Sequence, residues 1–433
     1  MTDARSIALH ALQRVEHGAY ANLALPELLR DSGLDARDRA FATDLVYGTV
    51  RKRRALDHLL APRSSQPLLK LESRVLAALR IGAYQLVEGV PAHAAVSETV
   101  AAVQPRARGY VNGVLRAVAR AGPPWPWPAG DGVEALGVRY SQPDWIVELL
   151  VSQFGSETAV AVLETSDTPP AVTLRVNPMR ATPADVARPL RDAGARVEAG
   201  RLLPDALVVT GVGDVGALDA VRNGRATPQD EASQAVAQLV ARELRDGARV
   251  LDVAAAPGGK STAIAEWTRD HVLVVAADLH RARVGRIKEA AQRLRLGSVA
   301  PLAADGRALP VPAEAFDAVL VDAPCSGLGA LRRRPDARWR IQPADVETLA
   351  AIQRDLLASA IAAVAPGGRL VYAVCTYAAA ETLGVDEWLA ATHPELAPLP
   401  PPGSPWRAHG RGALLLPSDA GTDGMFVLHL RRS

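Results

Sequence analysis

The chain contains only two cysteines, and each ends a hydrophobic run that predicts a buried strand. Cys325 follows residues 319–324, and Cys375 follows residues 370–374. A thiol at the carboxyl end of a parallel strand points into the crevice where open α/β sheets bind ligands. Two thiols placed in this way indicate cysteine chemistry on a single substrate. The alternative is that both are small buried hydrophobes, which is common for free cysteines.

A glycine-rich loop between a predicted strand at 250–253 and a helix is the second feature that could carry chemistry. The loop consists of Ala255, Ala256, Pro257, Gly258, Gly259 and Lys260. Glycine lets the backbone pass close to a ligand, and the start of a helix offers free N–H groups. The spacing is neither Gly-x-Gly-x-x-Gly nor Gly-x-x-x-x-Gly-Lys-Ser, which disfavours a dinucleotide site or a P-loop.

Two acidic residues follow the next two predicted strands. Asp278 ends the strand at 272–277, where a carboxylate can accept both hydroxyls of a ribose. Asp305 follows the strand at 300–303, and we expect it to accept the exocyclic amine of an adenine. Each aspartate alone could simply cap a helix. Together with the glycine loop they predict an adenosine ligand without a pyrophosphate, and S-adenosylmethionine fits.

The composition is that of an ordinary globular protein, with 48% apolar and 22% charged residues among 433. This length suffices for two or three domains. Two cysteines cannot form a disulfide framework, and neither a signal peptide nor a membrane-length apolar run is evident. We therefore expect a cytoplasmic monomer without a membrane partner and without a metal site.

Positive charge is clustered although the net charge is only +2. The clusters that we expect to bind RNA are Arg51, Lys52, Arg53 and Arg54, and then Arg332, Arg333, Arg334, Arg338 and Trp339. The arginines would grip phosphates and the tryptophan would stack on a base. The alternative for each run is a solvated helix face.

The elements that must position these residues form three predicted domains. Residues 1–125 show helical periodicity over about seven helices and predict an all-α domain, which the proline-rich segment 122–128 ends. Residues 126–225 predict a linker helix and a small α/β domain. Residues 226–433 alternate strands and helices, as a Rossmann-like α/β domain does. The predicted fold class is therefore multidomain.

Several motifs carry a family resemblance. They are the glycine loop 255–260, residues 322–327 around Cys325, Cys375 with Thr376, and the segments 229–233 and 423–426. In this order and spacing they resemble the RNA 5-methylcytosine methyltransferases of the RsmB/NOP2/NSUN family. The helical N-terminal region is similar in layout to NusB, an RNA-binding fold, and this combination is typical of the bacterial RsmB branch. One departure is Ala254, where many relatives have cysteine.

The resemblance implies methylation of carbon 5 of a cytosine in 16S ribosomal RNA, with S-adenosylmethionine as cofactor. It assigns attack on carbon 6 to Cys375 and product release to Cys325, an assignment that spacing alone leaves open. Asp322 would hold the ring nitrogen and the exocyclic amine of the base and would lie within the cofactor site. Lys260 would favour a thiolate or contact the base.

Two other functions stay open at this point. The same fold could transfer a methyl group to DNA or protein, because fold does not settle substrate. The chain could also be a non-catalytic RNA-binding factor, although Asp322, Cys325 and Cys375 argue against that.

Overall fold

The computed structural model describes residues 3–433, and these pack as two compact units. The first unit contains the chain up to Pro169 together with Leu331–Arg340, and the second contains Pro170–Ala330 and Ile341–Ser433. The division into three domains at residues 125 and 225 stays a prediction. The compact units differ from it in that residues 126–169 and 331–340 pack with the N-terminal helices.

Among the described residues from 3 onward, seven α-helices precede the proline-rich segment, as the helical periodicity predicts. They are α1 (Ala4–Glu16), α2 (Ala21–Arg30), α3 (Ala36–Arg51), α4 (Arg53–Leu60), α5 (Ser73–Val87), α6 (Ala92–Ala101) and α7 (Pro105–Ala121). Asp3 and Asp35 cap α1 and α3, because each side chain accepts a hydrogen bond from a backbone N–H of the first turn. Apolar residues at helical spacing, among them Leu45, Leu56 and Leu79, form the core of this unit.

Two further helices, α8 (Val133–Arg139) and α9 (Asp144–Ser166), complete the first unit. By length and composition α9 is the one helix among residues 3–433 that could cross a membrane, which corrects the expectation that no apolar run is long enough. However, Gly155 has a φ of 76° and interrupts the helical geometry. Neither half then reaches the roughly 20 residues that a membrane span needs.

The second unit begins with a small antiparallel sheet in the order β2-β3-β1-β4. Its elements are β1 (Val172–Val176), α10 (Pro183–Asp192), β2 (Arg196–Ala199), β3 (Ala206–Thr210), α11 (Asp219–Arg222) and β4 (Ala226–Pro228). Leu174, Val209 and Val186 pack in its core, between the sheet and α10. Thr182 and Asp185 form a capping box that starts α10.

A nine-stranded mixed sheet forms the rest of the second unit, in the order β11-β12-β13-β9-β8-β5-β6-β7, with β10 paired to β13. The strands are β5 (Arg249–Asp252), β6 (Leu273–Asp278), β7 (Val299–Ala303), β8 (Phe316–Asp322), β9 (Val364–Val374), β10 (Leu396–Pro398), β11 (Arg407–His409), β12 (Gly412–Leu415) and β13 (Met425–Arg432). Strands β5 to β9 are parallel, and β10 to β13 add to them antiparallel.

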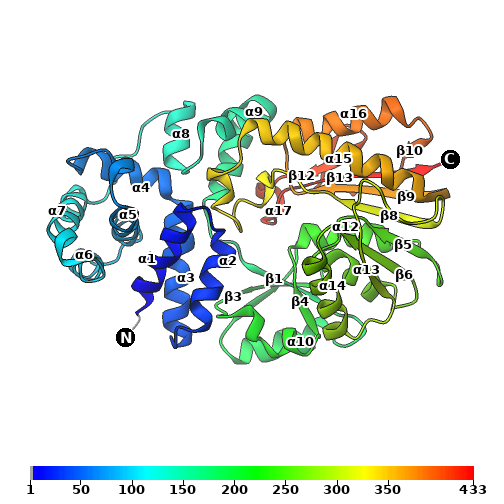
Figure 1. The fold of residues 1–433 in the computed structure, drawn as a ribbon, viewed down its shortest axis with the longest axis horizontal. Helices are drawn as coiled ribbons and strands as arrows, with labels where there is room; N and C mark the ends of the chain where they lie inside the picture. The colour runs from blue at the N-terminus through cyan, green and yellow to red at the C-terminus, as the bar shows by residue number, and fades with distance from the viewer. Residues whose placement is uncertain (1–2) are drawn as a thin grey trace. The chain divides into compact units, whose positions relative to one another are not determined.

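Helices cover both faces of this sheet (Figure 1). On one face lie α12 (Glu231–Ala241), α13 (Gly259–Trp267) and α14 (Arg281–Leu294), and on the other lie α15 (Pro343–Ala363) and α16 (Leu383–Thr392). The strand order reverses at β5, which lies between β6 and β8. Ligands bind at such a switch point, outside the carboxyl ends of the strands. The glycine loop and both cysteines follow strands of this part of the sheet.

Candidate active site

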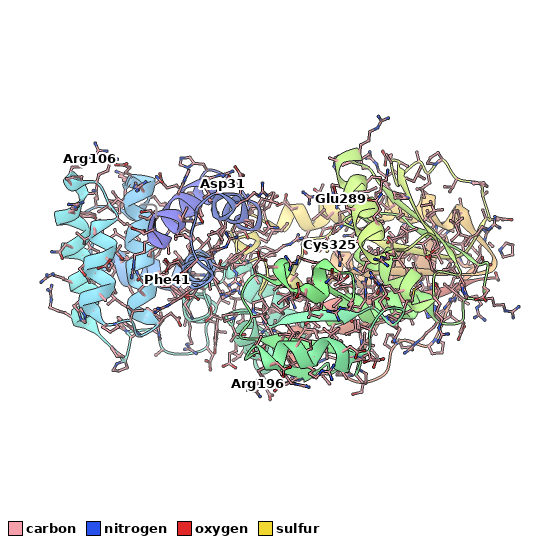
Figure 2. All side chains as sticks on the ribbon, turned by 90° about the horizontal axis from the view of Figure 1, so that it is seen from below. Asp31, Phe41, Arg106, Arg196, Glu289 and Cys325 are labelled. Atoms are coloured by element: carbon pink, nitrogen blue, oxygen red, sulfur yellow. The ribbon has the colours of Figure 1, made fainter. Side chains whose placement is uncertain are left out.

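The two cysteines meet at one edge of the large sheet. Strands β8 and β9 are parallel neighbours in which Asp322 pairs with Ala373, so the loops that follow them start at the same level. Cys325 (labelled in Figure 2) and Cys375 thereby place their Sγ atoms 3.4 Å apart, and both side chains are partly exposed. Two free thiols at this distance can act on one substrate atom after another.

A buried network behind the thiols fixes both loops. Ser326 follows Cys325 and Thr376 follows Cys375, and their hydroxyl oxygens lie 2.8 Å apart. The carboxylate of Glu381 accepts hydrogen bonds from the Ser326 backbone N–H at 2.8 Å and from the Ser326 hydroxyl. It also accepts from Gln353 Nε2 at 2.9 Å. No motif in the sequence pointed to Glu381, because its role depends on contacts between distant segments.

The surroundings of Cys325 oppose the ionisation of its thiol. The hydrogen bond to Cys375, then burial, and then the charge of Cys375 raise the pKa of Cys325 well above its usual value. Cys325 therefore keeps its proton next to Cys375.

Lys260 and Asp322 form an ion pair beside the thiols, with Lys260 Nζ 2.6 Å from Asp322 Oδ2. Burial would lower the pKa of Lys260, but the charge and hydrogen bond of Asp322, and then Cys375, raise it overall. The ammonium group is therefore retained next to Cys375. A positive charge at this position stabilises a thiolate.

The glycine loop passes from β5 into α13, as the sequence predicts. Gly258 has a φ of 99°, and a Cβ atom there would lie 3.2 Å from the Cα of Ile287, so only glycine fits without strain. Arg175 of β1 secures the start of α13 by donating to the Gly259 carbonyl at 2.7 Å and to Glu266 at 2.8 Å. The loop is thus held from the small sheet.

Asp278 ends β6 next to this loop, with only 3% of its surface exposed. Its carboxylate accepts hydrogen bonds from Ala256 N at 3.3 Å and from His280 N at 3.1 Å. It therefore fixes the loop and the turn that leads into α14, but it does not cap that helix, whose N-cap residue is His280. The ribose contact itself stays a prediction.

Asp305 follows β7 and lies closer to solvent. It pairs with Arg307 at 2.7 Å and accepts the Arg307 backbone N–H at 2.9 Å. The hydrogen bond from the Arg307 side chain lowers the pKa of Asp305 to about 2. The adenine contact stays a prediction, and an adenine amine would have to share this carboxylate with Arg307.

The two outlying motifs meet in the structure. Asp230 caps α12 through Ala232 N and accepts a hydrogen bond from Asp423 N at 3.1 Å. Glu231 accepts from the backbone N–H of Leu202 at 2.5 Å. Asp230, Glu231 and Asp423 of these two segments therefore have a structural role beside the large sheet.

Most side chains of the first basic cluster, residues 51–54, form hydrogen bonds or ion pairs within their own unit. Arg51 is only 5% exposed and donates to the Arg332 carbonyl at 3.1 Å. Lys52 pairs with Asp167 at 2.9 Å, and Arg54 pairs with Asp144 at 2.6 Å. The expectation that Arg51 binds RNA is therefore wrong, because its guanidinium is buried. RNA contacts by Lys52, Arg53 and Arg54 stay a prediction, and they would compete with these ion pairs.

The second basic cluster lies in the segment that packs with the first unit. Arg338 is fully buried and donates to the carbonyls of Ser141 and Ser166, each at 3.1 Å. The expectation that Arg338 grips phosphate is therefore wrong, because it is a structural anchor. Roles of Arg332, Arg333 and Arg334 in RNA binding stay predictions.

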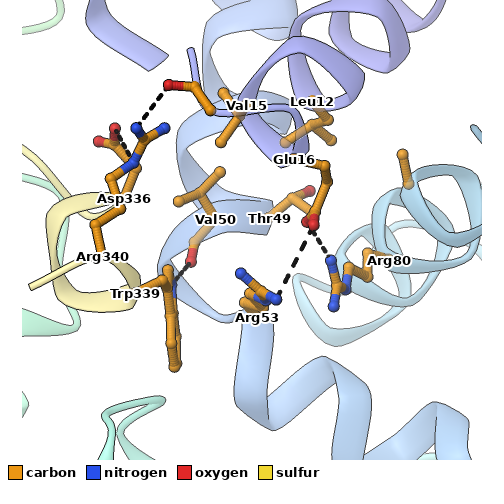
Figure 3. A pocket seen from close by; sticks show the side chains of 12 residues that line it. Leu12, Val15, Glu16, Thr49, Val50, Arg53, Arg80, Asp336, Trp339 and Arg340 are labelled. Carbon is orange, nitrogen blue, oxygen red and sulfur yellow. Dashed lines mark hydrogen bonds and ion pairs between the residues drawn. The ribbon is translucent and has the colours of Figure 1, made fainter. Parts of the chain in front are cut away.

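Trp339 and its neighbour Arg340 also hold this segment in place (Figure 3). The indole Nε1 of Trp339 donates to the Val50 carbonyl at 3.0 Å, and the guanidinium of Arg53 lies over its ring, 5.5 Å from the centroid. Arg340 donates to the Gly18 carbonyl at 2.8 Å. These residues line a cavity of about 280 Å³. Stacking of an RNA base on Trp339 is disfavoured, because Arg53 occupies one face of the ring.

Comparison with known proteins shows which family this chain resembles. Residues 239–431 match the model of the family described as 16S rRNA methyltransferase RsmB/F, residues 2–120 match the NusB family, and residues 142–216 match the ferredoxin-like domain of the RsmF/B-like methyltransferases. A probable ribosomal RNA small subunit methyltransferase B of Bacillus subtilis is 36% identical over 100% of this chain and 99% of its own length. The chain belongs to the RsmB/F methyltransferase family.

Other relatives extend this result. A putative methyltransferase of Mycobacterium tuberculosis is 40% identical over 99% of this chain and 96% of its own, and the ribosomal RNA small subunit methyltransferase B of Thermus thermophilus is 36% identical over 99% and 97%. The crystal structure of PH0851 superposes with a TM-score of 0.84 at 25% identity and covers 99% of each chain. The expected family and fold class, with a NusB-like domain and a Rossmann-like methyltransferase domain, are confirmed.

Proposed function

We propose that this RsmB/F-family methyltransferase transfers a methyl group from S-adenosylmethionine to carbon 5 of a cytosine in RNA, with 16S ribosomal RNA as substrate. The observation that carries the proposal is the pair of free thiols 3.4 Å apart, next to the ion pair of Lys260 and Asp322. Carbon 5 of cytosine is a poor nucleophile and needs a covalent partner at carbon 6. We also expect the enzyme to act as a cytoplasmic monomer.

The glycine loop, Asp278, Asp305 and Asp322 are the groups that would hold the cofactor. The donor set fits an adenosine ligand, because the loop is restricted to glycine at Gly258 and the Asp278 carboxylate lies against it. S-adenosylmethionine supplies an electrophilic methyl group when it is bound.

Cys375 begins the reaction as the nucleophile. An electron pair of its thiolate forms the bond to carbon 6, and the pair of the carbon 5–carbon 6 double bond shifts towards carbon 5. Asp322 holds the ring nitrogen and the amine of the base and so favours this shift. Carbon 5 then forms a bond to the methyl group, whose bond to the donor sulfur breaks with the electron pair left on that sulfur, and carbon 5 still carries its own proton.

Release requires a base for that proton, and we assign this role to Cys325. Its thiolate takes the proton, the electrons of the carbon–hydrogen bond restore the double bond, and the sulfur–carbon 6 bond breaks to return Cys375 as a thiolate. One proton leaves to solvent in each turnover, namely the one that Cys325 gives up before it acts.

The electrostatics of the pair put these roles in order. Cys325 keeps its proton mainly because of its hydrogen bond to Cys375, and the charge of Cys375 adds to this effect. Once Cys375 is bonded to carbon 6, it carries no charge and no longer accepts that hydrogen bond. The part of the rise in the pKa of Cys325 that comes from Cys375 is then lost, so the Cys325 thiol can release its proton and act as a thiolate base at the step that needs one.

The product of the reaction tests this proposal. Purified full-length protein should convert cytidine to 5-methylcytidine in a small-subunit ribosomal RNA transcript, as measured by mass spectrometry of the digested nucleosides. Replacing Asp322 by Asn, which keeps the shape but removes the charge that pairs with Lys260, should lower the rate strongly. A methyl group found on another base, on DNA or on protein would overturn the proposal.

A further inference from the structure

A groove with a volume of about 960 Å³ lies between α6 and α7. It lies in the first unit, and Arg106, labelled in Figure 2, marks the N-terminal end of α7. Its polar lining comes from His93 and Ser97 of α6 and from Arg108, Asn112, Arg116 and Arg120 of α7. Small and apolar residues, among them Val96, form its floor.

The polar residues of α7 form a regular stripe. Arg108, Asn112, Arg116 and Arg120 are spaced four residues apart, so they lie on one face of the helix. With a rise of about 1.5 Å per residue, the stripe extends about 18 Å. One strand of a stacked nucleic acid advances about 3.4 Å per nucleotide, so the stripe matches about five nucleotides.

The charge of the groove has a single sign. Among the described residues that line it, every charged side chain is a base, and no aspartate or glutamate is included. Arg108, Arg116 and Arg120 are exposed. This contrasts with the cluster at residues 51–54, in which Arg51 is buried and Lys52 and Arg54 form ion pairs.

Hydrogen bonds to neighbouring groups orient the guanidinium groups of Arg116 and Arg108. Arg116 Nε donates to Asn112 Oδ1 at 2.9 Å, which orients the guanidinium through one of its five donors. Arg108 donates to the carbonyl of Val103 at 3.3 Å. Ser97 and Asn112 add neutral hydrogen-bonding groups, which suit phosphate and ribose oxygens.

We propose that the groove between α6 and α7 binds the substrate RNA through its phosphate backbone, and that it supplies the RNA affinity which the cluster at 51–54 was expected to give. The proposal rests on the proposed function only in taking RNA as the substrate. An acidic protein segment would be attracted by the same charge. The regular spacing and the length of the stripe favour an RNA strand.

The test compares two full-length triple variants with equal changes in charge. The groove variant carries Arg108→Gln, Arg116→Gln and Arg120→Gln. The control carries Arg30→Gln, Arg37→Gln and Arg106→Gln, three exposed arginines of the same unit that do not line the groove. Affinity for a small-subunit ribosomal RNA fragment is measured by fluorescence anisotropy between 50 and 300 mM KCl.

The groove variant should bind RNA about ten- to a hundred-fold more weakly than the parent. Its plot of log K against log salt should be less steep by about 2, because each lost phosphate contact removes about 0.7 from the slope for a single strand. The control should change the slope by much less. In the groove variant KM for RNA should rise while kcat is kept, and in the control both should stay close to the values of the parent.

The other outcomes separate the two proposals. An unchanged slope and affinity in the groove variant would overturn the groove proposal, and so would an equal loss in the control. A parent that binds RNA but forms no 5-methylcytidine would overturn the proposed function and leave the binding comparison decisive for the groove. A parent without RNA affinity would refute both.

Discussion

Glu381 should control how the loop of Cys325 is placed, and its replacement is the most informative perturbation of the site. Its carboxylate accepts the backbone N–H of Ser326 at 2.8 Å, the Ser326 hydroxyl, and Gln353 Nε2 at 2.9 Å. The residue is fully buried, and burial raises its pKa, although the hydrogen bonds from Ser326 oppose this rise. Removing the carboxylate therefore leaves buried hydrogen-bond donors without this acceptor.

The cost of Glu381→Ala follows from what each donor has left. The Ser326 N–H has no other acceptor among its described hydrogen bonds, and leaving such a group buried costs about 1–3 kcal/mol. The Ser326 hydroxyl keeps its hydrogen bond with the Thr376 hydroxyl, and Gln353 Nε2 keeps its hydrogen bond to the Pro324 carbonyl at 2.9 Å. Each of these therefore loses about 1 kcal/mol. The variant no longer buries a carboxylate, which offsets part of this cost, so we expect the free energy of unfolding to fall by about 2–4 kcal/mol in total.

Activity should fall for a separate reason. A misplacement of about 1 Å can cost about a hundred-fold in rate, so Glu381→Ala should lower kcat ten- to a hundred-fold without changing KM for RNA. Because the displaced residue is Cys325, the variant should also accumulate a protein–RNA adduct. Glu381→Gln is the matched control, since its amide oxygen can still accept from Ser326, and it should regain most of the stability.

Chemical denaturation and steady-state methylation measure the two effects. If Glu381→Ala unfolds within about 0.5 kcal/mol of the parent and turns over at the parent rate, then Glu381 does not position Cys325. A loss of stability with no adduct would mean that its role is structural only.

Three further outcomes follow from the structure. Asp278→Ala should weaken S-adenosylmethionine binding about ten-fold or more in calorimetry on the full chain, since it removes a buried carboxylate beside the glycine loop, and unchanged affinity would refute the ribose contact. Burial raises the pKa of Asp252 to about 7, so the stability that this group contributes is complete below about pH 4 and is lost as the pH rises through about 7. The free energy of unfolding of Asp252→Asn should therefore rise relative to that of the parent between pH 4 and 8. A difference between the two proteins that stays constant with pH would contradict the shift. Arg338→Met should destabilise the protein by about 2–4 kcal/mol in chemical denaturation, because it leaves buried carbonyls without donors, whereas a loss below about 0.5 kcal/mol would show that Arg338 is no anchor.

The sequence predicts those parts of the fold that local patterns specify. Strands β5 to β9 were predicted because each contains a short apolar run bounded by turns or helices. Strands β10 to β13 were not predicted. Three of these are only three or four residues long, and β13 lacks alternation because six of its eight residues are buried. Only β13 pairs with β9, and the other three strands join the sheet through β13, so their pairing depends on distant contacts that no local pattern reveals.

The candidate site also contains residues that a local pattern reveals and residues whose role depends on contacts between distant segments. The thiols, the glycine loop and Asp322 were found because each follows a recognisable strand. Glu381 was missed, since it reaches Ser326 only in the folded chain. The predictions for Arg51 and Arg338 were wrong because burial, like the contacts of Glu381, cannot be read from a local pattern. A run of arginines does not show that carbonyls of Ser141 and Ser166 will bury Arg338, or that Arg51 will become part of the interior.

Exchange of each thiol tests the central claim most directly. Cys375→Ala and Cys325→Ala are each incubated with RNA, with and without S-adenosylmethionine, and resolved on a denaturing gel. Cys325→Ala should accumulate a protein–RNA adduct that needs S-adenosylmethionine, because attack and methyl transfer proceed while release fails. Cys375→Ala should give neither adduct nor methylation. Adducts trapped by Cys375→Ala and absent from Cys325→Ala would reverse the two roles, and full activity in both variants would show that neither thiol takes part in the reaction.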